Sequence, residues 1–225
     1  MAEALYENSS VLLTEDELAT LETLGQTLHR EAGHVFISEG EETDFALLIR
    51  KGHVKIVVGQ PPRIVAIRHA GEMVGEMAAI RRMPRSASVV ALDEVEVLHL
   101  PAGAWLNFLY EHPRAMHAQL ASQLERVEQA TRKIAESELA IEQRLAKSLI
   151  ELADSGIGTP SPTGVGLRFS QQDLANLTGA SLDSVKKIVR NFKTAGLLGT
   201  GRQTLLLRDP VKLREIADGH RTAAS

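Results

Sequence analysis

The stretch that decides the fold is GEMVGEMAAIRRMPRSASV, residues 71–89. Its glycines Gly71 and Gly75 permit tight turns and let the backbone approach a ligand, because no Cβ stands in the way. Residues Glu76–Ile80 predict one or two helical turns, whose free backbone N–H groups favour an anion. The stretch therefore predicts an anion site beside a glycine turn.

Three side chains of this stretch suit a sugar phosphate. Arg85 is a permanent cation with a planar fork of donors that matches a phosphate, and Ser86 adds a hydroxyl. Glu76 offers an acceptor for sugar hydroxyls. Alternatively, Glu76 is a first-turn carboxylate favoured by the helix dipole and Arg85 is its surface partner. Their placement around a glycine turn, among short β-strands, favours the ligand site.

The composition limits the class of protein only broadly. The chain has 225 residues, 44% hydrophobic and 24% charged, which is typical of one large or two small globular domains. Cysteine is absent, which excludes disulfides, thiolate metal sites and iron–sulfur clusters. No apolar run approaches the roughly 18 residues of a membrane span, and the N-terminus lacks a signal-peptide pattern. We therefore expect a cytoplasmic protein with no membrane partner.

Catalytic and metal-binding patterns are not expected. The eight histidines are scattered without a paired metal-ligand spacing, and His112 and His117 do not share a helix face. No Ser/His/Asp set or carboxylate pair can be placed together. The sequence therefore predicts a protein that is not an enzyme and that holds no metal or cofactor.

Charge is distributed unevenly. The net charge is −4, yet residues 165–208 hold seven Lys and Arg against two Asp. Residues 1–164 hold fifteen Lys and Arg against twenty-four Asp and Glu. An acidic body with a basic end is typical of a protein that presents one end to nucleic acid.

Residues 33–101 show short apolar alternations separated by glycine turns, which predict an antiparallel sandwich or barrel. A short helix over 14–28 precedes them. The predicted strands are His34–Ser38, Phe45–Arg50, Val54–Val58, Ile64–Arg68, Ser88–Ala91 and Val95–Leu100. The fold class is thus α+β, with a jelly-roll-like β-roll that contains the anion site.

A long helix follows from His112. Its apolar stripe has a spacing close to the 3.5 residues of a coiled-coil seam, and it weakens at a candidate hinge over 136–138. The stripe consists of Met116, Leu120, Leu124, Val127, Thr131, Ile134, Glu138 and Ile141. It packs either on the β-roll of the same chain or, as we favour, on a second copy, because one small domain cannot cover so long a stripe.

The C-terminal part predicts a winged helix-turn-helix. A helix capped by Ser170 is followed by a turn at Gly179 and by a second helix, capped by Ser181, with one apolar and one basic face. A helix at 141–154, a loop at 156–166, a strand-like segment at 167–169 and a hairpin at 197–207 surround the pair. The candidate DNA contacts are Ser170, Gln171, Ser181, Leu182, Asp183, Ser184, Lys186, Lys187, Arg190 and Arg202. An ordinary solvated basic face is the alternative for the second helix taken alone.

This order of parts resembles the Crp/Fnr family of bacterial transcription regulators over about residues 14–210. The residues that carry the resemblance are Gly75-Glu76-Met77-Ala78, Pro84-Arg85-Ser86-Ala87, the seam helix and the winged helix. It implies a β-roll domain for cyclic nucleotide over 1–111, a dimerisation helix and hinge over 112–140, and a DNA-binding domain over 141–225.

The resemblance also implies residue roles. Glu76 would bind the ribose 2′-hydroxyl, Arg85 and Ser86 the cyclic phosphate, and the region of Gly75, Met77 and Ala78 the ligand through its backbone. The cyclic-AMP-responsive members read the base with a Thr-Ser pair. Here the corresponding stretch is Ala130-Thr131-Arg132, so that only Thr131 offers a hydroxyl.

The recognition helix departs from the family as well. The Arg-Glu…Arg set of the family appears as Leu182-Asp183…Lys187. The lost first arginine removes a guanine contact worth roughly 1–3 kcal/mol of discrimination, so we do not expect the usual half-site.

The implied function is a homodimeric regulator that binds palindromic double-stranded DNA under the control of a cyclic nucleotide. Cyclic AMP is the expected ligand, with cyclic GMP as the alternative, and RNA polymerase is an expected partner. Two other hypotheses stay open. One is a regulator of the same family that is independent of cyclic nucleotide. The other is a nucleotide-sensing module that acts on a protein partner.

Overall fold

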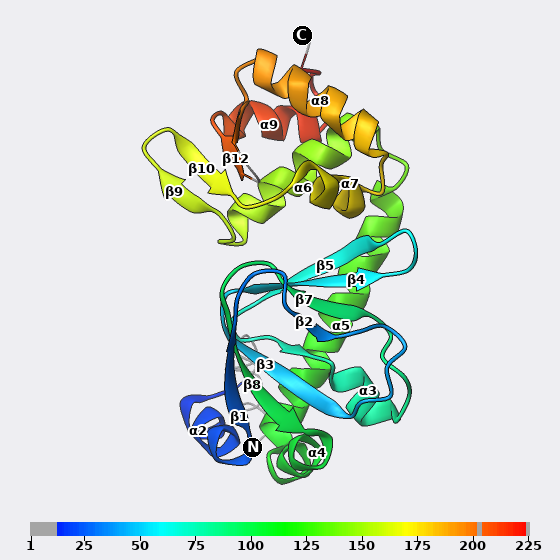
Figure 1. Ribbon diagram of the computed structural model, residues 1–225, viewed down its shortest axis with the longest axis vertical. Helices are drawn as coiled ribbons and strands as arrows, with labels where there is room; N and C mark the ends of the chain where they lie inside the picture. The colour runs from blue at the N-terminus through cyan, green and yellow to red at the C-terminus, as the bar shows by residue number, and fades with distance from the viewer. Residues whose placement is uncertain (1–12, 202–203, 224–225) are drawn as a thin grey trace. The chain divides into compact units, whose positions relative to one another are not determined.

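The structure is a computed structural model that describes residues 13–201 and 204–223. The chain divides into two compact units, with the division between Arg132 and Lys133 (Figure 1). Within the described residues no helix is both long enough and apolar enough to span a bilayer. Each unit is built around its own antiparallel sheets, which confirms the α+β class.

The first unit is a β-roll of two four-stranded antiparallel sheets. The strands of one sheet, in spatial order, are β1 (Gln26–Arg30), β8 (Val95–Pro101), β3 (Phe45–Lys51) and β6 (Met73–Val74). Those of the other sheet are β2 (Val35–Ile37), β7 (Ser88–Ala91), β4 (His53–Val58) and β5 (Arg63–His69). The six strands predicted from the sequence are confirmed to within one residue at each end.

The central strand β3 is buried on both faces, which explains its continuous apolar run. Leu47 and Ile49 join a core cluster between the two sheets, together with residues of β2, β4, β7 and β8. Ala46 and Leu48 alternate with them and face a second cluster that holds Trp105 and other helical residues. The helices in this second cluster are α2 (Glu15–Leu24), α4 (Ala102–Glu111) and the start of α5 (Pro113–Glu136).

The predicted helix over 14–28 is wrong over its last four residues. Helix α2 ends at Leu24, and residues 26–30 form β1, which pairs antiparallel with β8. Gly25 lies so close to the sheet that a Cβ would come within 2.6 Å of the His99 carbonyl oxygen. The chain therefore leaves the helix at Gly25, and Leu28 packs on the core between the sheets rather than on a helix face.

The second unit is a small sheet packed with helices. Its elements are α6 (Ile141–Asp154), β9 (Thr159–Ser161), β10 (Gly164–Leu167), α7 (Gln171–Thr178), α8 (Leu182–Thr194), β11 (Leu198–Gly201), β12 (Thr204–Leu207) and α9 (Pro210–Ala217). The sheet has the order β11-β12-β10-β9. Residues 156–166, expected as a loop, instead hold the hairpin β9–β10. Strand β10 pairs with β12 of the hairpin predicted at 197–207 and extends its sheet.

Candidate nucleotide site and nucleic-acid interface

Arg85 lies inside the β-roll rather than on its surface. It is 3% exposed and follows helix α3 (Glu76–Arg81). Its guanidinium donates to Thr43 Oγ1 at 2.8 Å, to the Gly75 carbonyl at 2.6 Å and to the Phe45 carbonyl at 2.9 Å. Burial lowers the pKa of Arg85, and nearby carboxylates oppose this effect. Since the group has five N–H donors, two remain for a ligand after these three contacts.

Gly75 is required by this arrangement in two ways. Its φ of 78° is a left-handed conformation that favours glycine. A Cβ at this position would also come within 2.7 Å of Ile37 Cδ1 and 2.9 Å of Arg85 Nη1. The turn lies where the glycine pattern predicts one, and its backbone is against the guanidinium of Arg85.

Glu76 is 2% exposed and is held by helix α5. Its Oε1 accepts from Gln123 Nε2 at 2.9 Å and from Arg126 Nη1 at 2.8 Å. Arg126 Nη2 also donates to the Met73 carbonyl at 2.6 Å. The sequence reasoning missed both α5 residues, which lie about 50 positions away in the chain. The only available signal was their spacing of three, which places them on neighbouring turns of α5 and outside the apolar stripe.

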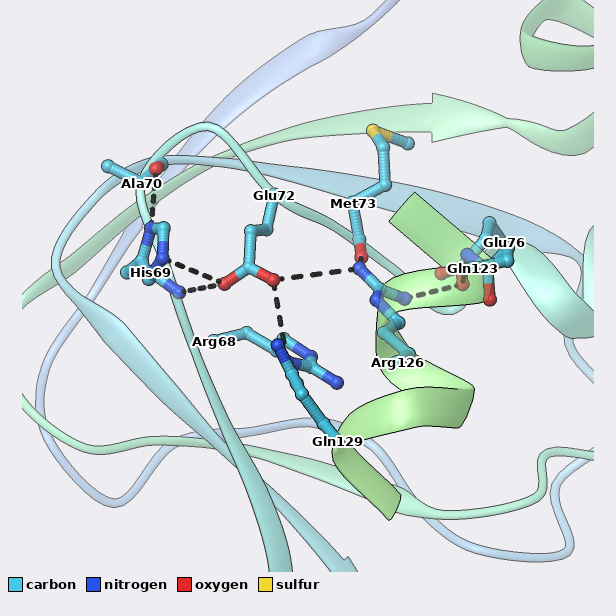
Figure 2. A network of polar contacts seen from close by, with 9 residues as sticks. All are labelled: Arg68, His69, Ala70, Glu72, Met73, Glu76, Gln123, Arg126 and Gln129. Carbon is cyan, nitrogen blue, oxygen red and sulfur yellow. Dashed lines mark hydrogen bonds and ion pairs between the residues drawn. The ribbon is translucent and has the colours of Figure 1, made fainter. Parts of the chain in front are cut away.

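A wider polar network continues from this pair (Figure 2). Glu72 Oε1 lies 3.9 Å from Arg126 Nη2 and 3.5 Å from Arg68 Nη1. Arg68, on β5, donates from Nη1 to Gln129 Oε1 at 3.1 Å. Glu72 Oε2 accepts from the backbone N–H of His69 at 2.8 Å. The network joins β5, the turn before β6 and the α5 face toward the β-roll.

The other predicted nucleotide-site residues take different places. Met77 and Ser86 are exposed, whereas Ala78 is buried in α3. Thr131 is exposed on α5, and its hydroxyl donates to the Val127 carbonyl at 2.9 Å. The structure therefore brings Gly75, Glu76 and Arg85 together but leaves Thr131 on the exposed apolar stripe.

The part of the chain that the structure describes leaves that stripe on α5 exposed. Met116, Leu120, Leu124, Val127 and Ile134 are 38–72% exposed. Gln123 and Arg126 lie outside the stripe on α5, and they bind residues of the β-roll. The alternative in which the stripe packs on the same β-roll is therefore wrong.

Helix α8 presents a cationic surface. Ser181 caps its N-terminus through the backbone N–H of Ser184, at 3.2 Å. Val185, Val189 and Phe192 are buried in the unit. The exposed residues of the other face are Asp183, Lys186, Lys187, Arg190, Asn191 and Lys193.

The remaining candidate DNA contacts lie around this helix. Ser170 caps α7 and its hydroxyl donates to Asp173, at 2.7 Å, in the predicted capping box. Gln171, Leu182 and Ser184 are half-buried. Arg202 lies outside the described residues. Among the described residues no group of His, Asp and Glu could hold a metal ion.

Two domain families match the chain. Residues 27–112 match the cyclic nucleotide-binding domain, and residues 143–216 match the Crp-like helix-turn-helix domain. A CRP-like cAMP-activated global transcriptional regulator of Mycobacterium tuberculosis is 26% identical over 189 residues, covering 80% of this chain and 83% of that protein. The cyclic AMP receptor protein of Thermus thermophilus is 26% identical over 193 residues, covering 83% and 86%.

Solved structures show the same fold. The c-di-GMP responsive global regulator CLP of Xanthomonas campestris matches with a TM-score of 0.77 at 20% identity, over 87% of this chain and 100% of that chain. A CRP-family transcriptional regulator of Thermus thermophilus matches with a TM-score of 0.76 at 20% identity, over 85% and 96%.

The parts define a class: a DNA-binding transcription regulator with a cyclic nucleotide-binding domain in front of a winged helix-turn-helix. The chain belongs to the Crp/Fnr family of transcription regulators.

Proposed function

We propose that this protein is a homodimeric regulator whose affinity for palindromic DNA is set by a 3′,5′-cyclic nucleotide bound in the β-roll. The observation that carries the proposal is the buried pair of opposite charges at one glycine turn. Arg85 keeps donors for a cyclic phosphate, and Glu76 lies directly after Gly75 as an acceptor for a ribose hydroxyl. Both are nine-tenths buried or more, which strengthens polar contacts to a ligand.

Helix α5 supplies the means of control. Glu76 binds Gln123 and Arg126 of that helix, so a ribose hydroxyl at Glu76 competes with or adds to these contacts. The ligand shifts the equilibrium only by its different affinity for the two arrangements of α5. The region after Glu136, where α5 ends and residues 137–140 precede α6, is the proposed hinge.

The exposed stripe on α5 supports the dimer. An exposed row of large apolar side chains at a spacing of three and four is the usual seam of paired helices. A two-fold dimer would place two copies of α8 for two half-sites of a palindrome. Contact with RNA polymerase stays a prediction of the resemblance.

Cyclic AMP is the first ligand to test, because the relatives at 26% identity carry it in their names. Calorimetry of the full chain with cyclic AMP and cyclic GMP tests the site, with Arg85→Leu as the variant that removes the phosphate contact. We expect binding by the native chain and loss of at least tenfold in affinity in Arg85→Leu. An absence of binding with either nucleotide would contradict the proposal and favour a regulator independent of cyclic nucleotide.

The DNA end is tested separately. Selection of bound fragments from random DNA, with and without cyclic nucleotide, should yield two-fold symmetric sites, and the affinity should fall steeply with salt. Arg190→Ala should reduce the slope of log affinity against log salt by about one. A failure to retain any DNA sequence would instead favour a module that acts on a protein partner.

A further inference from the structure

If the proposed function holds, the contacts around Glu76 indicate where the base of the nucleotide lies. A cyclic phosphate at Arg85 and a 2′-hydroxyl at Glu76 leave the base on the far side of the ribose, because C1′ carries the base while C3′ and C5′ carry the phosphate. From Glu76 the polar contacts lead to Arg126, then through Glu72 to Arg68 and Gln129 (Figure 2). This part of the network is therefore the surface nearest the base.

Helix geometry supports the same placement. Gln123, Arg126 and Gln129 are three residues apart and all three contact β-roll residues. At a rise of 1.5 Å per residue, Gln129 lies about 9 Å farther along α5 than Gln123, which is the scale of one nucleoside. Thr131 instead lies on the exposed stripe. The hydroxyl expected from the resemblance is therefore not on the α5 face that this chain turns toward its own β-roll.

Arg68, Arg126 and Gln129 offer hydrogen-bond donors on this surface, and Glu72 Oε1 already faces both arginines. Arginine only donates, so the amide oxygen of Gln129 must face Arg68, and the NH₂ group of Gln129 is left to donate elsewhere. Arg126 Nε is buried and has no hydrogen-bond partner among the described residues. Adjacent acceptors on a base would suit these donors, whereas an amino group would meet N–H groups of the protein.

Charge adds to this preference. The side chains of Arg68 and Arg126 are only 12% and 16% exposed. Burial and the nearby Arg126 lower the pKa of Arg68, and Glu72 and Glu76 oppose this effect. Arg68 Nη1 lies 3.5 Å from Glu72 Oε1, and this distance is longer than that of a hydrogen-bonded ion pair. An electron-rich base edge would reduce the repulsion between the two guanidiniums.

We propose that Arg68 and Gln129 read the base of the cyclic nucleotide and select guanine over adenine. Guanine presents O6 and N7 as two adjacent acceptors, which match the fork of an arginine. Adenine presents N7 beside the N6 amino group, which would face the same donors. A bidentate contact of this kind discriminates roughly 5- to 150-fold between the two bases.

Calorimetry of the full chain with three cyclic nucleotides tests this preference. Cyclic IMP is the matched ligand, because its hypoxanthine keeps O6 and N7 but lacks the 2-amino group of guanine. We expect cyclic GMP and cyclic IMP to bind at least tenfold more tightly than cyclic AMP. Tighter binding of cyclic AMP would overturn the inference while leaving the proposed function intact.

Variants of Arg68 identify the residue responsible. Arg68→Lys keeps the charge but loses the planar fork, so it should weaken cyclic GMP about tenfold and change cyclic AMP by less than threefold. Arg63→Lys, at an exposed position of the same strand, should change neither. The fluorescence of Trp105 confirms that each variant is folded. An equal loss for both nucleotides in Arg68→Lys would show a merely structural role and overturn the inference.

If no cyclic nucleotide binds to the native chain, the proposed function fails and this inference fails with it. The two failures are thus distinguishable, because only the first abolishes binding of all three ligands.

Discussion

Arg126→Met removes the cation that neutralises the most buried carboxylate of the described site. Arg126 Nη1 lies 2.8 Å from Glu76 Oε1, and Glu76 is 2% exposed. At an effective dielectric constant of 20, this separation corresponds to about 6 kcal/mol of attraction before desolvation is subtracted. Removal of one partner of a buried pair costs about 3–5 kcal/mol, because the other charge is left uncompensated. Gln123 still donates to Glu76, so we expect a loss of about 3 kcal/mol.

The single tryptophan makes the measurement selective. Trp105 is the only tryptophan of the chain and is fully buried in the first unit. Urea unfolding followed by its fluorescence therefore reports on the β-roll unit. With a slope of about 2 kcal/mol per molar, a loss of 3 kcal/mol shifts the midpoint by about 1.5 M.

A double-mutant cycle separates the pair from the rest of the site. Glu76→Gln combined with Arg126→Met should cost less than the sum of the two single changes, by about 2 kcal/mol. Gln123→Met is the matched control, because it removes a neutral donor to the same Glu76 oxygen. A loss below about 1 kcal/mol in Arg126→Met, or additive single changes, would refute the reasoning.

Other substitutions test separate parts of the account. Gly75→Ala should destabilise the first unit by about 1–3 kcal/mol and weaken nucleotide binding, because the new methyl group meets Arg85 at a positive φ. Trp105 fluorescence and calorimetry measure the two effects, and unchanged stability would contradict this prediction. Leu120→Glu combined with Leu124→Glu should convert the proposed dimer to a folded monomer in sedimentation velocity, and a dimer that persists would exclude the α5 seam. Burial opposes ionisation of Glu17, but hydrogen bonds from Arg114 and Thr14 lower its pKa overall. A group with a lowered folded-state pKa stabilises the fold above its unfolded pKa and loses this effect as the pH falls. Glu17→Gln should therefore cost about 1–2 kcal/mol at pH 7 and progressively less below pH 4.5, which unfolding at a series of pH values would show; a constant difference would contradict the assignment.

The sequence was sufficient where a local pattern determines the structure. Alternation and glycine turns located the strands of the β-roll, and the capping pattern Ser170–Asp173 located α7. The glycine turn at Gly75 also followed from residue types alone. Each of these depends on neighbours within a few positions, or on the steric demands of one residue.

The sequence was insufficient where partners are distant in the chain. Nothing near Glu76 indicates that Arg126 pairs with it, and Arg68 and Gln129 meet only because β5 and α5 lie side by side. The helix expected to include Leu28 failed for the same reason, because β8 recruits residues 26–30 as a strand. Cyclic AMP stays a prediction of the resemblance, and a preference for guanine is our proposal from the positions of Arg68 and Gln129.

Reciprocal linkage between the two ligands tests the central claim most directly. The affinity of the full chain for its selected DNA is measured with and without saturating cyclic nucleotide, and the affinity for the nucleotide with and without saturating DNA. The account predicts that both affinities change by the same factor, of about 5 to 150, and that Arg85→Leu abolishes the change. Equal DNA affinity with and without a nucleotide that binds would contradict control of the DNA-binding unit by the β-roll site.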